Sequence, residues 1–140
     1  MARWLLKTEP GTYSFDDLVR EKKTRWEGVS NPVALKHIRS MKKGDDLIIY
    51  HTGKERAAVG TGTVISNPYA DPKAKNDRIV VVDIKPGKRF ATPVTLDQIR
   101  ADSAFAGWDL LRIGRLSVVP VSDAIWKRLE KLASGKPSGD

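Results

Sequence analysis

Cysteine is absent from this chain of 140 residues, so the sequence excludes disulfide bonds and metal sites built from thiolates. No apolar run approaches the ~20 residues that a membrane-spanning helix needs. The opening Met-Ala-Arg-Trp brings in a charge too early for a secretory signal peptide. We therefore expect a cytoplasmic protein with no membrane partner.

The sequence also lacks the common signatures of catalysis. It contains no Gly-x-Ser-x-Gly elbow, no His-Glu-x-x-His pair and no glycine-rich phosphate loop. There are only two histidines, His37 and His51. Acidic residues such as Asp17 and Asp45 fall at helix starts and turns, where capping explains them. We expect a protein that is not an enzyme, with no catalytic residue, no metal site and no cofactor.

Positive charge is in excess, with a formal net charge of +8. Such an excess favours polyanions, nucleic acids above all, through counterion release. A basic surface without any partner would give the same charge. The length predicts a single domain over residues 1–133. The tail at 134–140, rich in Gly, Pro and Ser, is predicted to be disordered.

The predicted secondary structure mixes strands and helices. Capping boxes begin at Ser14 and Thr95, and Asn31 before a proline is a third helix start. Alternate glycines near 58–65 indicate a bulge or a close backbone approach. The polar loop at 67–77 has the length of a functional or mobile segment. We expect strands at 3–8, 46–51, 58–65, 78–84 and 116–121, and helices at 15–22, 32–41, after Thr95 and after Ser122.

Trp26 lies between a basic run and a turn, outside any apolar period. Ser30 and Asn31 follow it and offer a hydroxyl and an amide. An accessible indole beside such groups is suited to hold one flat heterocycle, such as a nucleobase. The alternative is a tryptophan in the core, the role that the surrounding patterns predict for Trp4 and Trp126.

Five segments carry a family resemblance: Trp-Leu-Leu-Lys-Thr-Glu-Pro at 4–10, Tyr-Ser-Phe-Asp-Asp-Leu at 13–18, Trp-Glu-Gly-Val-Ser-Asn at 26–31, Tyr-His at 50–51 and Arg-Leu-Ser-Val-Val-Pro-Val at 115–121. In this order they resemble the EVE domain family, a branch of the PUA-like superfamily related to the YTH readers of methylated RNA. The resemblance runs from about Arg3 to Leu132. It implies an α+β fold, a PUA-like small and partly open β-barrel of five to six strands flanked by helices.

The same resemblance implies a base-sized pocket with Trp26 on its wall. One departure is Ser30, because many family members carry arginine before the asparagine. If that arginine contacts phosphate, this chain binds strands more weakly or in another geometry. The residues expected at the base pocket are Lys7, Thr8, Trp26, Ser30, Asn31, His51, Thr52, Tyr69, Arg115 and Ser117.

Several of these residues also have a structural interpretation. Asn31 can act as a helix cap alone, and His51 can be a buried histidine bonded to the backbone. On the polar face of the helix after Asn31, we expect Lys36, Arg39 and Lys43 to contact phosphates. The alternative for these three is a solvated helix face.

Together these observations predict a non-catalytic, nucleic-acid-associated domain that accommodates a single, modified nucleobase in an aromatic-walled pocket. The nucleic acid is DNA or RNA, with single strands preferred, because extruding a paired base costs a few kcal/mol. One alternative is a general RNA-binding accessory of PUA-like type that reads structured RNA by shape. The other is a binder of small molecules or nucleosides, or a weak enzyme, that uses His51.

Overall fold

The computed structural model describes residues 2–135. The strands are β1 (Arg3–Thr8), β2 (Thr24–Trp26), β3 (Asp46–His51), β4 (Ala57–Val64), β5 (Tyr69–Ala70), β6 (Val80–Thr95) and β7 (Val118–Pro120). The helices are α1 (Phe15–Glu21), α2 (Pro32–Ser40), α3 (Leu96–Ala101), the 3-10 turn η1 (Ser103–Phe105), α4 (Asp109–Arg112) and α5 (Asp123–Ala133).

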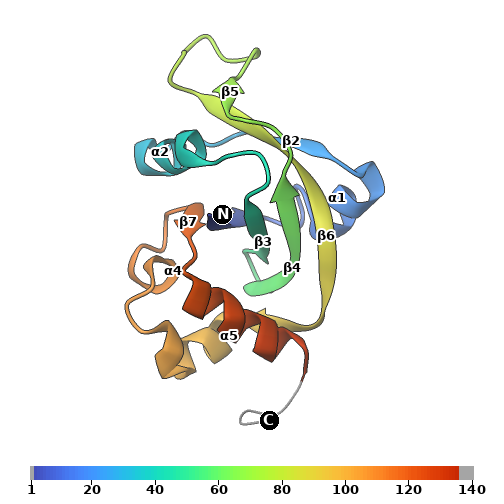
Figure 1. Ribbon diagram of the computed structural model, residues 1–140, viewed down its shortest axis with the longest axis vertical. Helices are drawn as coiled ribbons and strands as arrows, with labels where there is room; N and C mark the ends of the chain where they lie inside the picture. The colour runs from blue at the N-terminus through green and yellow to red at the C-terminus, as the bar shows by residue number, and fades with distance from the viewer. Residues whose placement is uncertain (1, 136–140) are drawn as a thin grey trace.

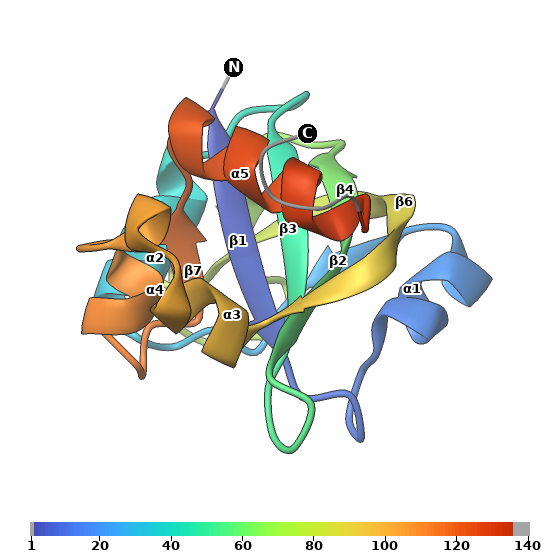
Figure 2. The same ribbon diagram turned by 90° about the horizontal axis from the view of Figure 1, so that it is seen from below.

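Across the described residues the strands form one curled, mixed sheet in the order β2-β6-β4-β3-β1-β7, with β5 paired to β6 beside this path. β1 and β3 are parallel, and the other pairs are antiparallel. Helix α5 closes one end of the curl, while α2 and α1 lie on opposite sides of it (Figures 1 and 2). This is the predicted α+β, PUA-like half-barrel. Within residues 2–135, each helix is too short or too polar to cross a bilayer.

The centre of the sheet supplies most of the core. β3 is buried at every position after Asp46, as its continuous apolar run predicts, and β1 buries three successive residues from Trp4. Ser14 and Asp17 form the predicted capping box, which starts α1 so that Phe15 and Leu18 point into the core. The capping residues therefore determine where α1 begins and which of its side chains face the core.

The predicted strand at 78–84 is wrong in its extent, because β6 continues through a proline to Thr95. The pairing of β6 with β4 shifts register twice, around Gly60 and before Gly62. A Cβ on Gly60 would lie 2.6 Å from the Phe15 ring, and one on Gly62 would lie 2.9 Å from the Lys85 carbonyl oxygen. The glycines thus permit the close approach that curls the sheet, as expected from their alternation.

Two short strands, β2 and β5, were not predicted, because two or three residues leave no periodic pattern. β2 forms only by pairing with β6, with Trp26 opposite Val82. At the other end of the chain, the backbone N–H of Ser134 donates to Glu130 and ends α5. The rest of the predicted tail, 136–140, lies outside the described residues.

Candidate functional site

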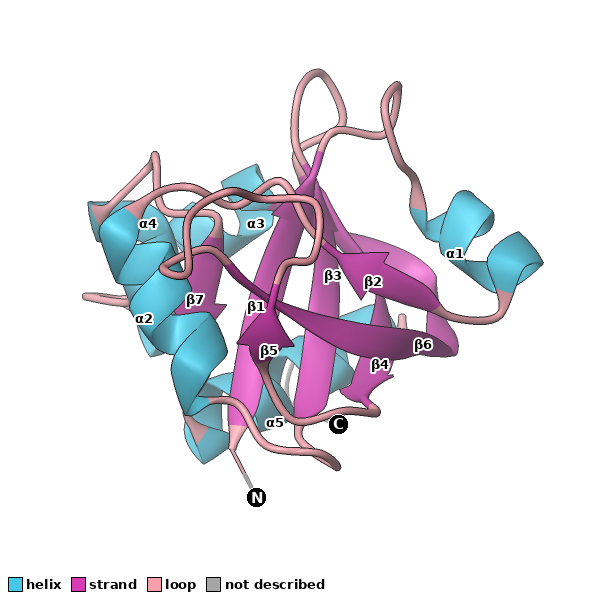
Figure 3. Cartoon of the chain, turned by 90° about the horizontal axis from the view of Figure 1, so that it is seen from above, coloured by secondary structure: helices cyan, strands magenta, loops and turns pink. Residues whose placement is uncertain are grey.

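A groove of about 600 Å³ opens where the carboxyl end of β1, the two ends of α1 and strand β2 meet. Figure 3 shows β2, the edge strand of the sheet, on the side where α1 lies. The turn after β2 and Ser117, the residue before β7, complete the wall of the groove. The groove is lined by Lys7, Thr8, Glu9, Thr12, Tyr13, Glu21, Thr24, Arg25, Trp26, Glu27, Gly28, Val29 and Ser117.

Trp26 lies at this groove, but it is a buried strand residue, whereas the sequence predicted a more accessible indole. The residue ends β2 and is only 7% exposed, because pairing with β6 draws the ring into the core. Among the described residues, no acceptor forms a hydrogen bond with the Trp26 indole N–H. No fully buried side-chain nitrogen or oxygen of these residues lacks a partner. The indole N–H is therefore not fully buried, and Trp26 is a lining residue whose donor the described residues leave unused.

The second aromatic side chain of the groove is Tyr13, not the predicted Tyr69. The Tyr13 ring stands edge-on to Trp26, with 6.2 Å between centroids and 81° between planes. Its hydroxyl donates to Oε1 of Glu21 at 2.6 Å. Burial, followed by this bond to Glu21, raises the pKa of Tyr13 to about 12. The phenol therefore remains protonated at any physiological pH.

The groove carries both signs of charge. Lys7 is half-buried, and its ammonium group donates to the carbonyl oxygen of Gly114 at 3.1 Å. Burial lowers the pKa of Lys7. Arg25 lies 3.9 Å from a carboxylate oxygen of Glu27. With Glu9 and Glu21 also on the wall, the groove contains more carboxylates than cations, although the whole chain is basic.

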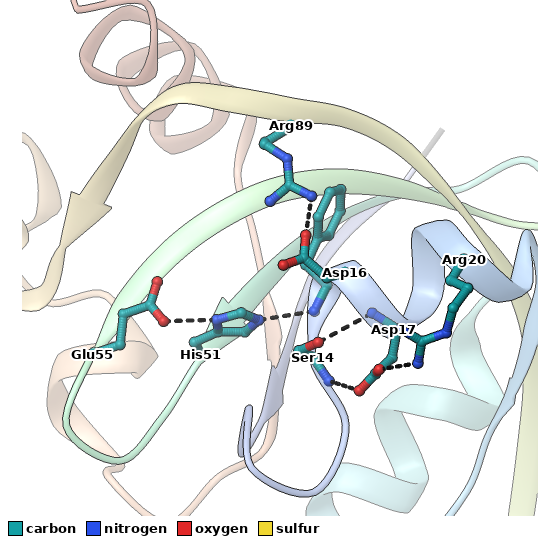
Figure 4. Close-up of polar contacts among 8 residues, drawn as sticks. Ser14, Asp16, Asp17, Arg20, His51, Glu55 and Arg89 are labelled. Carbon is teal, nitrogen blue, oxygen red and sulfur yellow. Dashed lines mark hydrogen bonds and ion pairs between the residues drawn. The ribbon is translucent and has the colours of Figure 1, made fainter.

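His51 does not line the groove, and its bonds are those of a structural histidine. The backbone N–H of Phe15 donates to Nε2 at 2.9 Å, so Nδ1 carries the proton and faces Glu55 at 2.9 Å. Figure 4 shows the ring between Glu55 and the start of α1. A buried backbone N–H at a helix start needs an acceptor, and His51 provides it. The expected base contact of His51 is not supported by this placement.

Asn31 also accepts hydrogen bonds from backbone N–H groups. Its Oδ1 accepts from the N–H groups of Val33 and Ala34 at 2.9 and 3.1 Å, which is the cap predicted as the alternative to a base contact. Asn31 and Ser30 are exposed just beyond the lining residues of the turn. They adjoin the groove without forming its wall.

Three other expected residues lie outside the wall as well. Tyr69 donates to Asp83 at 2.6 Å and accepts from Arg25 at 3.2 Å, which holds it against β6. Thr52 is joined to β1 by its backbone N–H, and Arg115 is exposed in the loop before β7. Of the ten residues expected at the pocket, the structure brings together four: Lys7, Thr8, Trp26 and Ser117.

The expected phosphate contacts are likewise away from the groove. Arg39 donates to the carbonyl oxygen of Arg78 at 3.1 Å and so ties α2 to the loop before β6. The backbone N–H of Lys43 donates to Asn67 at 3.3 Å. Lys36 is exposed on α2. None of these three cations borders the groove beside Trp26.

Two residues of the groove wall, Tyr13 and Glu21, were not predicted, although a signal for them exists in the sequence. Tyr13 lies in the segment at 13–18 that carries the resemblance. Glu21 is the last residue of α1, the helix that begins in that segment. Their meeting depends on the turn before α1, where the Thr8 hydroxyl donates to the Tyr13 carbonyl oxygen at 2.6 Å. No periodic pattern predicts that contact.

Other sites were sought among residues 2–135. No group of three or more acidic or histidine side chains there could hold a metal ion. A smaller hollow of about 280 Å³ lies between α5 and β6, beside Trp126 and Phe90. It contains none of the residues expected from the sequence. The groove beside Trp26 is therefore the better candidate for a binding site.

Comparison with known proteins agrees with this geometry. The EVE domain model matches residues 2–132. Human thymocyte nuclear protein 1 is 26% identical over 171 residues, which cover 98% of this chain and 76% of the human protein. The solution structure of Rpa0253 from Rhodopseudomonas palustris is 35% identical, with a TM-score of 0.91 over 98% of this chain and 96% of that chain.

A further structure, of human THYN1 in complex with DNA that contains 5-methylcytosine, has a TM-score of 0.88. It is 23% identical to this chain and covers 98% of it and 100% of the THYN1 chain. At that identity the match shows a shared fold. The half-barrel, the segments that border the groove and a family model spanning nearly all of the sequence agree, and the chain belongs to the EVE domain family.

Proposed function

We propose that this protein is a non-catalytic nucleic-acid-binding domain that takes a single modified nucleobase into the groove beside Trp26. The observation that carries the proposal is the groove itself, with an unused indole donor and a second aromatic ring, Tyr13, on its wall. A volume of about 600 Å³ lies within the roughly 300–1,000 Å³ range of small-ligand sites. A nucleobase fits this size.

The relative with DNA bound supports nucleic acid as the ligand. Human THYN1 shares the fold and has been crystallised with DNA that contains 5-methylcytosine. The net charge of +8 supports the same ligand class, since it favours polyanions without reading sequence. We expect the exposed cations of α2, Lys36 and Arg39, to contribute to this general attraction together with Lys43.

The energetics favour single strands. Stacking on an aromatic side chain contributes about 1–3 kcal/mol per base, and extruding a paired base costs a few kcal/mol. These two contributions nearly cancel in a duplex. A methyl group buried on the base adds only about 0.8 kcal/mol. Binding should therefore be weak, sensitive to salt and modest in its preference for the modified base.

The test is a binding titration with a fluorescently labelled single-stranded oligonucleotide that carries one 5-methylcytosine. Replacing Trp26 by phenylalanine keeps a ring but removes the indole N–H. We expect affinity to fall about fivefold, the equivalent of one hydrogen bond. The matched control is Trp126→Phe, a change at equal exposure on α5, which should leave affinity unchanged.

Equal affinities of the wild type and Trp26→Phe would contradict a base site in this groove. Displacement by folded RNA, with no effect of free modified nucleoside, would instead favour the general RNA-binding alternative. Mass spectrometry of the recovered oligonucleotide tests the absence of catalysis. Its mass should be unchanged after prolonged incubation.

A further inference from the structure

The carboxylates of the groove are unexpected in a basic chain that binds nucleic acid. Glu9, Glu21 and Glu27 line the wall, where they repel phosphate but accept hydrogen bonds from a base. Glu27 is balanced by Arg25 at 3.9 Å and by Lys73 at 3.7 Å. Glu9 is exposed at the end of β1. Glu21 differs from both because its partner is an uncharged side chain of the wall, the phenol of Tyr13.

The contact between Tyr13 and Glu21 fixes the direction of hydrogen bonding at this part of the groove. The phenol proton is committed to Oε1 of Glu21 at 2.6 Å. An oxygen whose only proton is used can offer further partners only its lone pairs. The second carboxylate oxygen of Glu21 is likewise an acceptor alone. The Thr24 hydroxyl also hydrogen-bonds to the phenol oxygen and uses part of its accepting capacity. The two side chains therefore present their remaining lone pairs as acceptors and no free donor.

Contacts of its backbone and of its ring hold the Tyr13 phenol in place. The backbone N–H of Tyr13 donates to the Glu9 carbonyl oxygen at 2.9 Å, and its own carbonyl accepts from the Thr8 hydroxyl. Its ring packs edge-on against Trp26. Backbone and ring thus fix the hydroxyl from two sides, so a ligand meets a preformed acceptor.

Donors occur elsewhere on the same wall. The Trp26 indole N–H has no acceptor within the described residues, and the ammonium group of Lys7 has protons beyond the one it gives to Gly114. A base edge with an amino group beside an acceptor atom matches such a divided wall. Cytosine and adenine both have this arrangement, with an exocyclic amine beside a ring-nitrogen acceptor.

We propose that Tyr13 and Glu21 form an acceptor wall that selects a base with an exocyclic amino group, cytosine or adenine, over one with a carbonyl at that position, thymine or uracil. This inference rests on the proposed function and adds the substrate class. In this role both residues determine specificity. Binding the wrong base sets its carbonyl oxygen against the phenol oxygen and the carboxylate.

The experiment compares two single-stranded oligonucleotides that differ at one base, 5-methylcytosine or thymine. Both bases carry the same methyl group on the same ring, so the comparison isolates the amino group and its neighbouring ring nitrogen. We expect the wild type to bind the 5-methylcytosine strand at least about 10-fold more tightly, the effect of one good base contact. Titration by fluorescence anisotropy measures both affinities.

Two variants test the residues. Glu21→Gln replaces an acceptor by an amide that also donates, and we expect it to reduce the preference to about twofold. Glu21 is exposed, so this variant should fold, and its melting temperature provides the check. Tyr13→Phe removes the acceptor oxygen and should reduce the preference as well. Glu130→Gln, the same charge change on α5, should leave the preference unchanged.

Failure of this inference and failure of the proposed function give different results. If the wild type binds both strands equally while Trp26→Phe still weakens binding, the groove holds a base but the acceptor wall does not select it. If Trp26→Phe has no effect on either strand, the base site itself is wrong. A preference that survives in both Glu21→Gln and Tyr13→Phe would also overturn the assignment.

Discussion

Trp4 and Trp26 are equally buried, each 7% exposed, yet they lie in very different surroundings. Trp4 sits in β1, between β3 and β7, and its indole N–H donates to Asp45 at 3.1 Å. Trp26 ends β2 at the margin of the sheet, and its N–H has no acceptor within the described residues. Burial alone therefore does not separate the tryptophan of the central sheet from the one that borders the groove. The hydrogen bond does.

The polar groups around the two rings differ in the same way. Asp45 is 2% exposed and also accepts from the backbone N–H of Lys42 at 2.9 Å, so it is part of the core. Beside Trp26, the bond from Tyr13 to Glu21 leaves both residues able to accept from a ligand. Around Trp4 the polar groups are matched within the fold, whereas beside Trp26 the indole N–H has no acceptor among residues 2–135.

The largest effect should come from Asp45→Ala. This change leaves the Trp4 indole and the Lys42 backbone N–H without an acceptor, and we expect the free energy of unfolding to fall by about 3 kcal/mol. Denaturation by urea measures it. The neighbouring Asp46→Ala is the control, because this 41% exposed side chain makes a 3.5 Å surface pair with Arg3. Its loss should stay below about 1 kcal/mol.

A direct test of the comparison is the same substitution at both tryptophans. Trp4→Phe leaves the buried Asp45 carboxylate without one of its donors, whereas Trp26→Phe removes an N–H that the protein does not use. We expect Trp4→Phe to destabilise the fold by about 2 kcal/mol more than Trp26→Phe. Equal losses would show that the two indoles are equivalent. Thermal and chemical denaturation of both variants decides this.

The variant His51→Ala tests whether the support that His51 gives to the start of α1 is independent of binding in the groove. The change removes the acceptor of the Phe15 backbone N–H, at an expected cost of about 1–2 kcal/mol in stability. Affinity for the oligonucleotide should not change at a temperature where the variant is folded. The control is Glu55→Gln, whose amide oxygen can still accept from Nδ1. A loss of affinity in His51→Ala would return this histidine to the binding site.

The smallest effect concerns pH near Trp4. His37 lies 5.6 Å from the Trp4 ring, and burial lowers its pKa below 6.5. A lowered pKa means that the folded state binds protons less readily than the unfolded state. His37 should therefore favour the folded state above pH 6.5, and this contribution should be lost as pH falls through the lowered pKa. The variant His37→Gln should flatten this part of the stability profile.

Helices and central strands could be predicted because their signals are local. The caps at Ser14, Asn31 and Thr95 start helices where expected, since each side chain meets N–H groups two or three residues away. The apolar run of β3 identified a central strand for a similar reason. β6 could not be delimited, because Pro86 and Gly87 look like a strand end and only the register shifts against β4 let the strand continue.

The candidate site was predictable in part. Trp26, Lys7, Thr8 and Ser117 follow from the family resemblance, and they do line the groove. His51 and Asn31 belong to the segments that carry the same resemblance, but each accepts a hydrogen bond from a backbone N–H at a helix start. The resemblance located segments that border the groove. It could not say which side chains in them face the groove and which support the backbone.

The sequence by itself determined the family, the α+β class and the start of each main helix, because these depend on neighbours within a few residues or on motifs read in order. Only the tertiary structure decided that Trp26 is buried at a strand end, that Tyr13 meets Glu21, and that His51 holds α1. Those facts depend on residues brought together from distant parts of the chain. Whether a donor is used or left for a ligand depends on which acceptor the fold places within about 3 Å of it.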